Sequence, residues 1–341
     1  MKTYIFWILI LFLYAGFNSC LQKNSSESGE KISSKEKYLN YLDSLKGKGA
    51  LAGQFIRWNY NASLEEIKIL HDSSGQWLSM LGADYYGNFK DSVPGAECAY
   101  ELTNSVLINY LGEKDIVNLS VHFNNPQTSG AAWDNDMDFD SLFVENSRVR
   151  KIFYGELDKV SVGLEELADA NVNIMFRPFH EMNGRWFWWG KRKKYFKELW
   201  IMTYNYLVEE KGLKNMLWCY SPDAGQPDYL LYYPGDAYVD IVGLDAYTQD
   251  LPSRARKGYE ELIALGKPFG FTEYGCYSGG GLSNPDEREL FDYSIMGDWL
   301  QNDFPEAVFF LAWRDYFGMA QNTGVNQLLN HKYIIKKKTK N

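Results

Sequence analysis

Apolar runs bounded by turn residues recur along the chain, and stretches with helical spacing separate them. This alternation is typical of βα units and differs from the closely spaced strands of a sandwich. Runs with the length and composition of strands, eight in all, occupy residues 50–55, 76–83, 116–123, 172–179, 215–220, 239–245, 268–272 and 307–313. We therefore expect these runs to form one sheet.

Helical patterns fill the intervals between the predicted strands. They occupy residues 64–72, 98–111, 139–170, 195–210, 252–265 and 285–301, with shorter material around 228–233. The alternation continues from about residue 51 to residue 313 without a Pro/Gly/Ser-rich linker. A closed barrel needs about eight such units, and this span is close to its usual size. The pattern predicts an α/β fold, a (β/α)8 or TIM barrel, as a single domain over residues 37–335.

Polar, titratable and aromatic residues gather where the predicted strands end. In barrels of this type the reacting groups lie at those ends. The positions are His122, His180-Glu181, Ser221-Pro222-Asp223, Asp245-Ala246-Tyr247, Glu273-Tyr274 and Trp313-Arg314-Asp315. Exposed loops are polar in any protein, which explains one such position more easily than all six.

Two glutamates among these positions suggest a reaction. Glu181 follows the fourth predicted strand in NVNIMFRPFHEMNGRWFWWG, and Glu273 follows the seventh in GKPFGFTEYG. Glycoside hydrolysis with retention needs two carboxyl groups about 5–5.5 Å apart, one protonated and one ionised. Aromatic surroundings and the charge of Glu273 would favour the protonated form of Glu181. The hypothesis is that Glu181 is the acid/base and Glu273 the nucleophile.

The amino-acid composition limits the classes of molecule that this protein can be expected to bind. Lys and Arg number 35 against 44 Asp and Glu, a formal net charge of -9, so no basic field attracts nucleic acid. Aromatic residues make up 16% of the chain, with 11 Trp and 25 Tyr. Core packing uses many such rings, and an open cleft is the functional alternative because sugar C–H faces lie well against them. We expect Trp188 and Trp189 to be wall packing.

The sequence gives less support to metal-dependent catalysis or to a serine nucleophile. A zincin motif needs a second histidine four residues after His180, where Gly184 stands. The chain has 4 His, and only His122 and His180 lie at predicted strand ends, too few for a histidine-rich metal site. No G-x-S-x-G sequence supports a serine nucleophile. We expect no metal and no cofactor.

Five sequence strings together resemble glycoside hydrolase family 26. They are SVHFNNP, RPFHEMNGRWFWWG, YPGDAYVDIVGLDAY, KPFGFTEYG and AWRD, and the resemblance covers residues 51–313. The family consists of retaining enzymes of the large barrel clan A, with the acid/base after strand four and the nucleophile after strand seven. By this resemblance Glu181 is the acid/base and Glu273 is the nucleophile.

The resemblance also implies roles in substrate binding. His180 is similar to a histidine that forms hydrogen bonds near the nucleophile and the sugar, and His122 to one that contacts substrate. Trp186 resembles part of the sugar platform beside the cleavage point, and Trp313 the ring under the −1 sugar. Tyr247 resembles a tyrosine whose hydroxyl orients the nucleophile. Each of these side chains could instead be a packed core residue.

The implied substrate is a β-1,4-mannan, including gluco- or galactomannan, cleaved by double displacement. Related family members cut mixed-linkage β-glucan or β-1,3-xylan, which stay as alternatives. Endo-cleavage and release of mannobiose also both stay open. A hypothesis of another class is a non-catalytic glycan-binding lipoprotein, which would be expected to lack a catalytic carboxylate.

The first 20 residues, MKTYIFWILILFLYAGFNSC, indicate an export signal. A basic start at Lys2 precedes an apolar run over residues 5–17, which is short for a bilayer span. The segment resembles a bacterial lipoprotein signal with Cys20 as the lipidated residue; ordinary secretion is the alternative. Residues 21–36 are polar and Ser-rich, as in a flexible tether. We expect an exported monomer whose one membrane contact is a lipid anchor.

The remaining cysteines and the C-terminus carry no further chemistry. Cys98, Cys219 and Cys276 allow at most one internal disulfide, and no C-x-x-C pair occurs. Residues 336–341 form a lysine-rich tail, for which a solvated end is expected.

Overall fold

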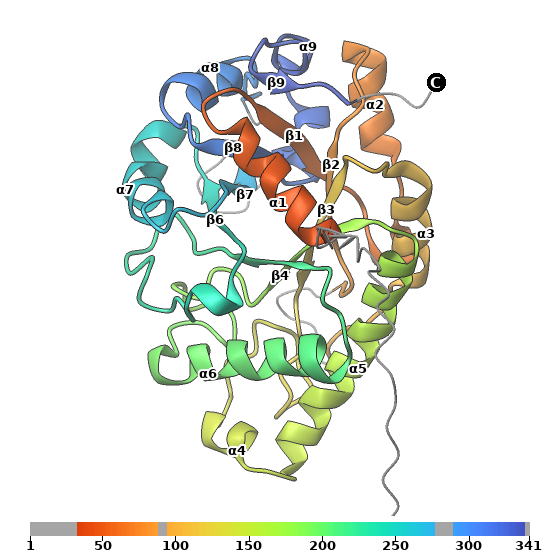
Figure 1. The fold of residues 1–341 in the computed structure, drawn as a ribbon, viewed down its shortest axis with the longest axis vertical. Coiled ribbons are helices and arrows are strands. Elements are labelled where there is room, and N and C mark those ends of the chain that lie inside the picture. The colour runs from red at the N-terminus through yellow and green to blue at the C-terminus, as the bar shows by residue number, and fades with distance from the viewer. Residues whose placement is uncertain (1–32, 88–93, 277–288, 338–341) are drawn as a thin grey trace, which may run out of the picture. The chain divides into compact units, whose positions relative to one another are not determined.

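Eight parallel strands close into a barrel in the computed structural model, which describes residues 33–87, 94–276 and 289–337 (Figure 1). The strands are β1 (Ala50–Phe55), β2 (Met80–Asp84), β3 (Ile116–Val121), β4 (Asn173–Pro178), β5 (Leu217–Tyr220), β6 (Ile241–Tyr247), β7 (Phe269–Gly275) and β8 (Ala307–Ala312). Neighbours in sequence are paired in parallel, and β1 also pairs with β8, which closes the sheet. A short strand, β9 (Ile334–Ile335), pairs with β1. The predicted (β/α)8 barrel is confirmed.

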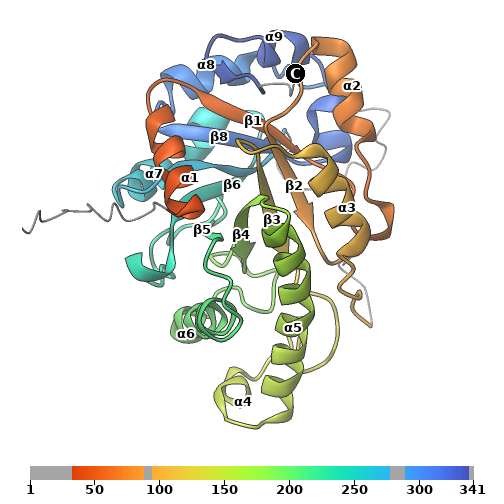
Figure 2. The same cartoon turned by 45° about the vertical axis from the view of Figure 1, so that its right-hand side comes forward.

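The strands are apolar runs because both of their faces are covered. Every residue of β1, β3 and β8 is buried, as expected for a parallel sheet with helices outside it. Inward-facing residues from several strands, Phe55 and Met80 among them, form one core cluster. Tyr38, Leu42 and Leu45 of helix α1 (Ser34–Leu45) join that cluster. Helix α1 thus adds to the barrel core from outside the eight βα units (Figure 2).

Helices connect the strands as the pattern predicts. They are α2 (Glu65–Ser74), α3 (Glu101–Tyr110), α4 (Phe139–Phe143), α5 (Arg148–Asp169), α6 (Lys193–Tyr204), α7 (Leu251–Ile263), α8 (Ile295–Asn302) and α9 (Val325–Leu329). Helix α6 continues into a π-helical segment, Asn205–Glu210. In α5, Val149, Phe153, Leu157 and Val160 are buried, a three- and four-residue spacing that packs one face on the barrel.

Two predicted helices are wrong in their extent. The predicted helix over 139–170 is two helices, because Asn146 has a φ of 64° and Ser147 is extended, with its hydroxyl capping Arg150. In the predicted helix over 285–301, residues 285–288 lie outside the described part. The described residues 289–294 are not helical, with Asp292 in a bridge and Tyr293 in a turn, and the helix α8 begins at Ile295.

The structure also bears on the predicted chain ends. The signal with Cys20, and the tether up to residue 32, lie outside the described residues. Helix α1 begins at Ser34, inside the range 21–36 predicted as tether, and the Ser33 hydroxyl caps it. At the other end, Lys337 of the predicted tail pairs with Asp115 at 2.7 Å. Residues from Ser33 onward form one compact unit.

None of Cys98, Cys219 and Cys276 forms the internal disulfide that the sequence left open. Cys219 and Cys276 are fully buried, as small apolar packing residues often are. Within residues 33–87, 94–276 and 289–337, no helix has the length and apolar character needed to cross a membrane.

Candidate active site

The two predicted catalytic glutamates lie at the same end of the barrel. Glu181 follows β4 after a turn in which both Phe179 and Glu181 have positive φ, 52° and 54°. Such a backbone is strained for residues other than glycine, and strain of this kind clusters at functional sites. Glu273 lies within β7, which continues past the predicted end at residue 272 to Gly275. The strand itself therefore holds Glu273, whereas a turn positions Glu181.

The carboxyl groups of the two glutamates face one another. Ligand-type oxygen atoms of Glu181, Asp245 and Glu273 all lie within 4.8 Å of one another, and all three residues are buried. Retaining glycosidases place their carboxyl groups about 5–5.5 Å apart, whereas inverting enzymes need about 6.5–9.5 Å to admit a water. The close approach of these oxygen atoms agrees with the retaining arrangement.

Donors surround the carboxylate of Glu273. The Arg177 guanidinium donates to one oxygen through Nη2, and the Tyr247 hydroxyl donates to the other at 2.7 Å. His180 Nε2 lies 3.9 Å from Oε1. Tyr247 is in β6, one strand before Glu273, and its ring packs edge to face on Phe317. These contacts hold the carboxylate in one orientation and stabilise its charge, as a nucleophile requires.

Glu181 lies in the opposite kind of environment. Burial raises the pKa of its carboxyl well above the usual value, and the charges of Asp223, Asp245 and Glu273 raise it further. The Trp186 indole donates to Oε2 at 2.5 Å, which works against that rise. The protonated form of Glu181 therefore persists to higher pH than in an ordinary glutamate, as a general acid needs.

A buried ion-pair network lies beneath the carboxyl pair. Arg177 Nη1 is 2.6 Å from Asp245, and both side chains are fully buried. Asp245 also accepts hydrogen bonds from the hydroxyls of Ser221 at 2.8 Å and Thr272 at 2.6 Å. Three carboxylates close together could in principle hold a metal ion. Here the guanidinium of Arg177 already supplies a fixed cation to Glu273 and Asp245, and its charge would oppose a second one.

The two predicted histidines are in contact. The rings of His122 and His180 meet edge to face with centroids 4.6 Å apart. Burial lowers the pKa of His180, and the charge of Arg177 lowers it further, so the ring is neutral. His122 Nδ1 lies 2.8 Å from Asp84, which is fully buried at the end of β2. The sequence pattern did not identify Asp84 as a site residue. Its position, as an acidic residue at the end of an apolar strand, could have identified it.

The predicted sugar-binding rings also lie close to the site. Trp313 follows β8 and packs against Phe55 and Trp58, at centroid distances of 4.5 and 5.5 Å. Trp58, which the strand pattern did not single out, extends this aromatic surface. Trp188 and Trp189 are fully buried, in agreement with their interpretation as wall packing.

Loop aspartates near the site have separate environments. Burial raises the pKa of Asp223 to about 6, although the backbone N–H of Gly225 donates to its carboxylate and opposes the rise. Asn183 forms two hydrogen bonds with the backbone of Asp223, and so ties the loop after β5 to the turn of Glu181. Asp315 instead pairs with Arg57 and Arg314.

A (β/α)8 barrel whose mouth holds two neighbouring glutamates, one with a raised pKa and one that accepts hydrogen bonds from Arg177 and Tyr247, is typical of the class of retaining glycoside hydrolases. Comparison with known proteins gives the family. The chain belongs to glycosyl hydrolase family 26, whose model matches residues 29–339. The resemblance inferred from the five sequence strings is therefore confirmed.

Individual relatives match over most of their length. A mannan endo-1,4-beta-mannosidase of Bacillus subtilis (strain 168) is 32% identical over 317 residues, 88% of this chain and 84% of that protein. The solved structure of the Bacillus subtilis mannanase BCman is 31% identical with a TM-score of 0.78, covering 89% of this chain and 92% of that one. GH26A from Muricauda sp. MAR_2010_75 is 26% identical with a TM-score of 0.74, covering 90% and 97%.

Proposed function

We propose that this protein hydrolyses β-1,4-mannan with retention of anomeric configuration. One observation carries the reaction type: an oxygen of Glu181 lies within 4.8 Å of an oxygen of Glu273, and both residues are buried. Burial and nearby carboxylates raise the pKa of Glu181, whereas Glu273 accepts a hydrogen bond from the guanidinium of Arg177. The polymer is inferred from relatives that are named as mannanases and that this chain matches over most of their length.

In the first step Glu273 attacks the anomeric carbon and forms a covalent glycosyl-enzyme. Arg177 and Tyr247 donate hydrogen bonds to its two oxygens and so hold the carboxylate in one orientation. Protonated Glu181 gives its proton to the departing glycosidic oxygen. No cofactor is needed, because the two side chains supply both the nucleophile and the proton.

In the second step ionised Glu181 takes a proton from water, which attacks the anomeric carbon and releases Glu273. The group must therefore be stable in both charge states. Burial favours its neutral form, whereas the indole N–H of Trp186 donates to the anion. We infer that Trp186 makes the ionised state accessible after proton transfer, in addition to any contact with sugar.

The test is release of reducing ends from mannan, lichenan and β-1,3-xylan, with the anomeric configuration of the first product followed by NMR. Cleavage of mannan with an initial β-product supports the proposal. Preference for lichenan or xylan would show that the substrate is not mannan, but it would not contradict the double-displacement mechanism. No release from any polymer would favour the non-catalytic glycan-binding alternative, and an initial α-product would exclude retention.

We further propose that the enzyme is exported and attached to a bacterial membrane through lipidated Cys20. The supporting observation is the signal-like pattern of residues 1–20, followed by a polar segment. Replacing Cys20 by alanine should move the protein from the membrane fraction to the soluble fraction. Unchanged membrane association would contradict the anchor. Light scattering of the soluble form should give a monomer.

A further inference from the structure

The carboxyl group of Asp84, at the end of β2, contacts two different parts of the barrel mouth. Its Oδ1 accepts hydrogen bonds from the backbone N–H groups of Tyr86 at 2.7 Å and of His122 at 3.4 Å. Its Oδ2 lies 2.8 Å from Nδ1 of the His122 imidazole, and the side chain of Asp84 is fully buried. The two oxygens therefore have separate partners, which are backbone groups for one and an imidazole for the other.

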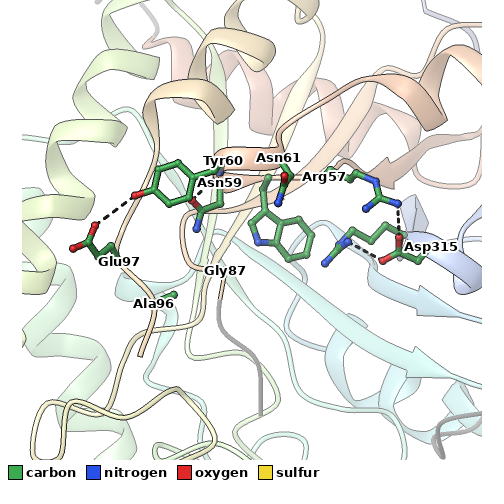
Figure 3. Close-up of a pocket in the computed structure, with 10 residues that line it drawn as sticks. Arg57, Asn59, Tyr60, Asn61, Gly87, Ala96, Glu97 and Asp315 are labelled. Atoms are coloured by element: carbon green, nitrogen blue, oxygen red, sulfur yellow. Dashed lines mark hydrogen bonds and ion pairs between the residues drawn. The ribbon is translucent and has the colours of Figure 1, made fainter. Parts of the chain in front are cut away.

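The contact of Oδ1 with the Tyr86 N–H holds the loop after β2. It closes a turn that begins at the last residue of the strand. The carbonyl of Tyr86 accepts a hydrogen bond from the Trp58 indole at 3.0 Å. The next residue, Gly87, lines a cavity of about 540 Å³ that has Tyr60 at one end and Asp315 at the other (Figure 3). This oxygen thus has a structural role.

The contact of Oδ2 is with a ring that its neighbours hold in one orientation. The ring of Trp133 stacks on His122 with centroids 5.2 Å apart. The rings of His180 and Phe187 meet it edge to face, with centroids at 4.6 and 5.3 Å. These contacts restrict rotation of the imidazole, so its Nδ1 stays beside Asp84.

The proton between Asp84 and His122 lies on the imidazole. A carboxylic acid is a stronger acid than an imidazolium, and the hydrogen bonds to Oδ1 stabilise the carboxylate anion further. An ionised carboxylate can only accept hydrogen bonds, so Nδ1 carries the proton that it donates to Oδ2. In the neutral ring the lone pair is then on Nε2.

We propose that Asp84 is a positioning residue, which holds the proton of neutral His122 on Nδ1 and so leaves the lone pair of Nε2 to accept a hydrogen bond from a substrate hydroxyl. This inference rests on the proposed function and on the substrate contact that the family resemblance implies for His122. A neutral imidazole can carry its proton on either nitrogen, and the hydrogen bond at one nitrogen decides the role of the other.

The test is Asp84→Asn, which separates the two contacts of the carboxylate. The amide oxygen can replace Oδ1 as the acceptor for the Tyr86 N–H, and the NH2 group then lies beside Nδ1 of His122. Because an NH2 group only donates, the ring proton should move to Nε2. The substrate hydroxyl would lose its acceptor, so kcat/KM on mannan should fall about 10-fold.

NMR of protein labelled with 15N-histidine identifies the protonated nitrogen, at a pH where the rings are neutral. The chain has 4 His, and the signals of His122 are those missing from His122→Gln. We expect the proton on Nδ1 in the wild type and on Nε2 in Asp84→Asn. A wild-type ring protonated on Nε2, or the same tautomer in both proteins, would overturn the proposal.

The matched control is Asp298→Asn, because the carboxylate of Asp298 is exposed and lies 3.6 Å from Nε2 of another histidine, His331. This variant should leave both the His122 signals and kcat/KM unchanged. A change of the His122 tautomer in this control would show that the NMR response is not specific to the contact with Asp84, and would also count against the proposal.

A double-mutant cycle distinguishes positioning from the structural role of Oδ1. If Asp84 acts through His122, Asp84→Asn should lower kcat/KM no further in His122→Gln. Losses that multiply would assign the effect to the loop after β2 and overturn the proposal. The proposed function fails differently, when the unmodified enzyme prefers another polymer or cuts none. The cycle is then run on the preferred polymer; if none is cut, the NMR measurement decides, since it needs no substrate.

Discussion

Glu181 and Glu273 are the same residue type at one barrel mouth, yet their surroundings differ in almost every respect. Glu273 is held within a strand and receives hydrogen bonds from Arg177 and Tyr247. Glu181 follows a strained turn, receives one hydrogen bond from the Trp186 indole and faces other carboxylates. Both carboxyl groups are buried, but the first environment supplies positive charge and the second supplies negative charge.

This difference shows that environment assigns the roles of acid and nucleophile. Two carboxyl groups close together cannot both ionise freely, so the cation of Arg177 decides which one carries the charge. The pair is then asymmetric before any substrate binds. Variants that remove one of the two glutamates, or one charged residue near them, test whether the two environments differ in this way.

The largest effect is expected for Glu273→Ala. Without the nucleophile no glycosyl-enzyme can form, so kcat should fall by a factor on the order of 10⁴ or more on every substrate. Steady-state assays on mannan and on an activated aryl mannoside measure this. Azide, which fits the space of the missing carboxylate, should restore turnover and give an α-glycosyl azide. Rescue with a β-product would contradict the role of nucleophile.

Glu181→Ala should depend on the leaving group. Loss of general acid catalysis costs about 10²- to 10⁴-fold where the leaving oxygen needs a proton. Formation of the glycosyl-enzyme from an aryl glycoside with a good leaving group should change far less. Pre-steady-state release of the phenol compared with hydrolysis of mannan separates the two cases. Equal losses on both substrates would show that Glu181 is not the acid.

Arg177→Met tests the cation that makes the pair asymmetric. Removing it leaves two buried carboxylates without their partner, which should lower the free energy of unfolding by about 3–5 kcal/mol. Chemical denaturation measures the change. The matched control is Arg57→Met, because its ion pair with Asp315 is exposed and should contribute less than about 1 kcal/mol. Similar losses in both variants would argue against a special role for the buried network.

The smallest effect is a shift of the pH profile in Asp223→Asn. The charge of Asp223 helps to raise the pKa of Glu181, so its removal should lower that pKa. Glu181 would then lose its proton at a lower pH, and the basic limb of kcat/KM should move to lower pH. Asp228→Asn, an exposed residue of the same loop that pairs with Lys191, is the control and should leave the limb in place. A shift to higher pH would refute this coupling.

Much of the fold was predictable because each strand is buried on both faces and is bounded by turn residues. All eight strands were predicted, and the range predicted for β1 matches the structure. Errors arose where local backbone geometry overrides periodicity. Apolar spacing runs across Asn146, but its positive φ ends one helix and lets Ser147 cap the next. Helix α1 lies in a polar segment that the strand pattern did not mark.

The candidate site was predictable in its residue types and less so in its contacts. The sequence strings identified Glu181, Glu273 and Tyr247, and the structure brings them together. The partnership of Asp84 with His122 joins ends of different strands, and periodicity along one strand carries no information about it. The strand pattern did not identify Trp58 for the same reason, because its place in the aromatic surface depends on its packing against Trp313.

The amino-acid sequence by itself determined the barrel, the family and the two glutamates that react, because strand periodicity and local motifs are properties of contiguous residues. The tertiary structure supplied the contacts that make the two glutamates different, since Arg177, Asp223 and Tyr247 come from β4, the loop after β5 and β6. It also formed the cavity between Tyr60 and Asp315. Charge and shape at a site depend on distances in space, which only the closed barrel defines.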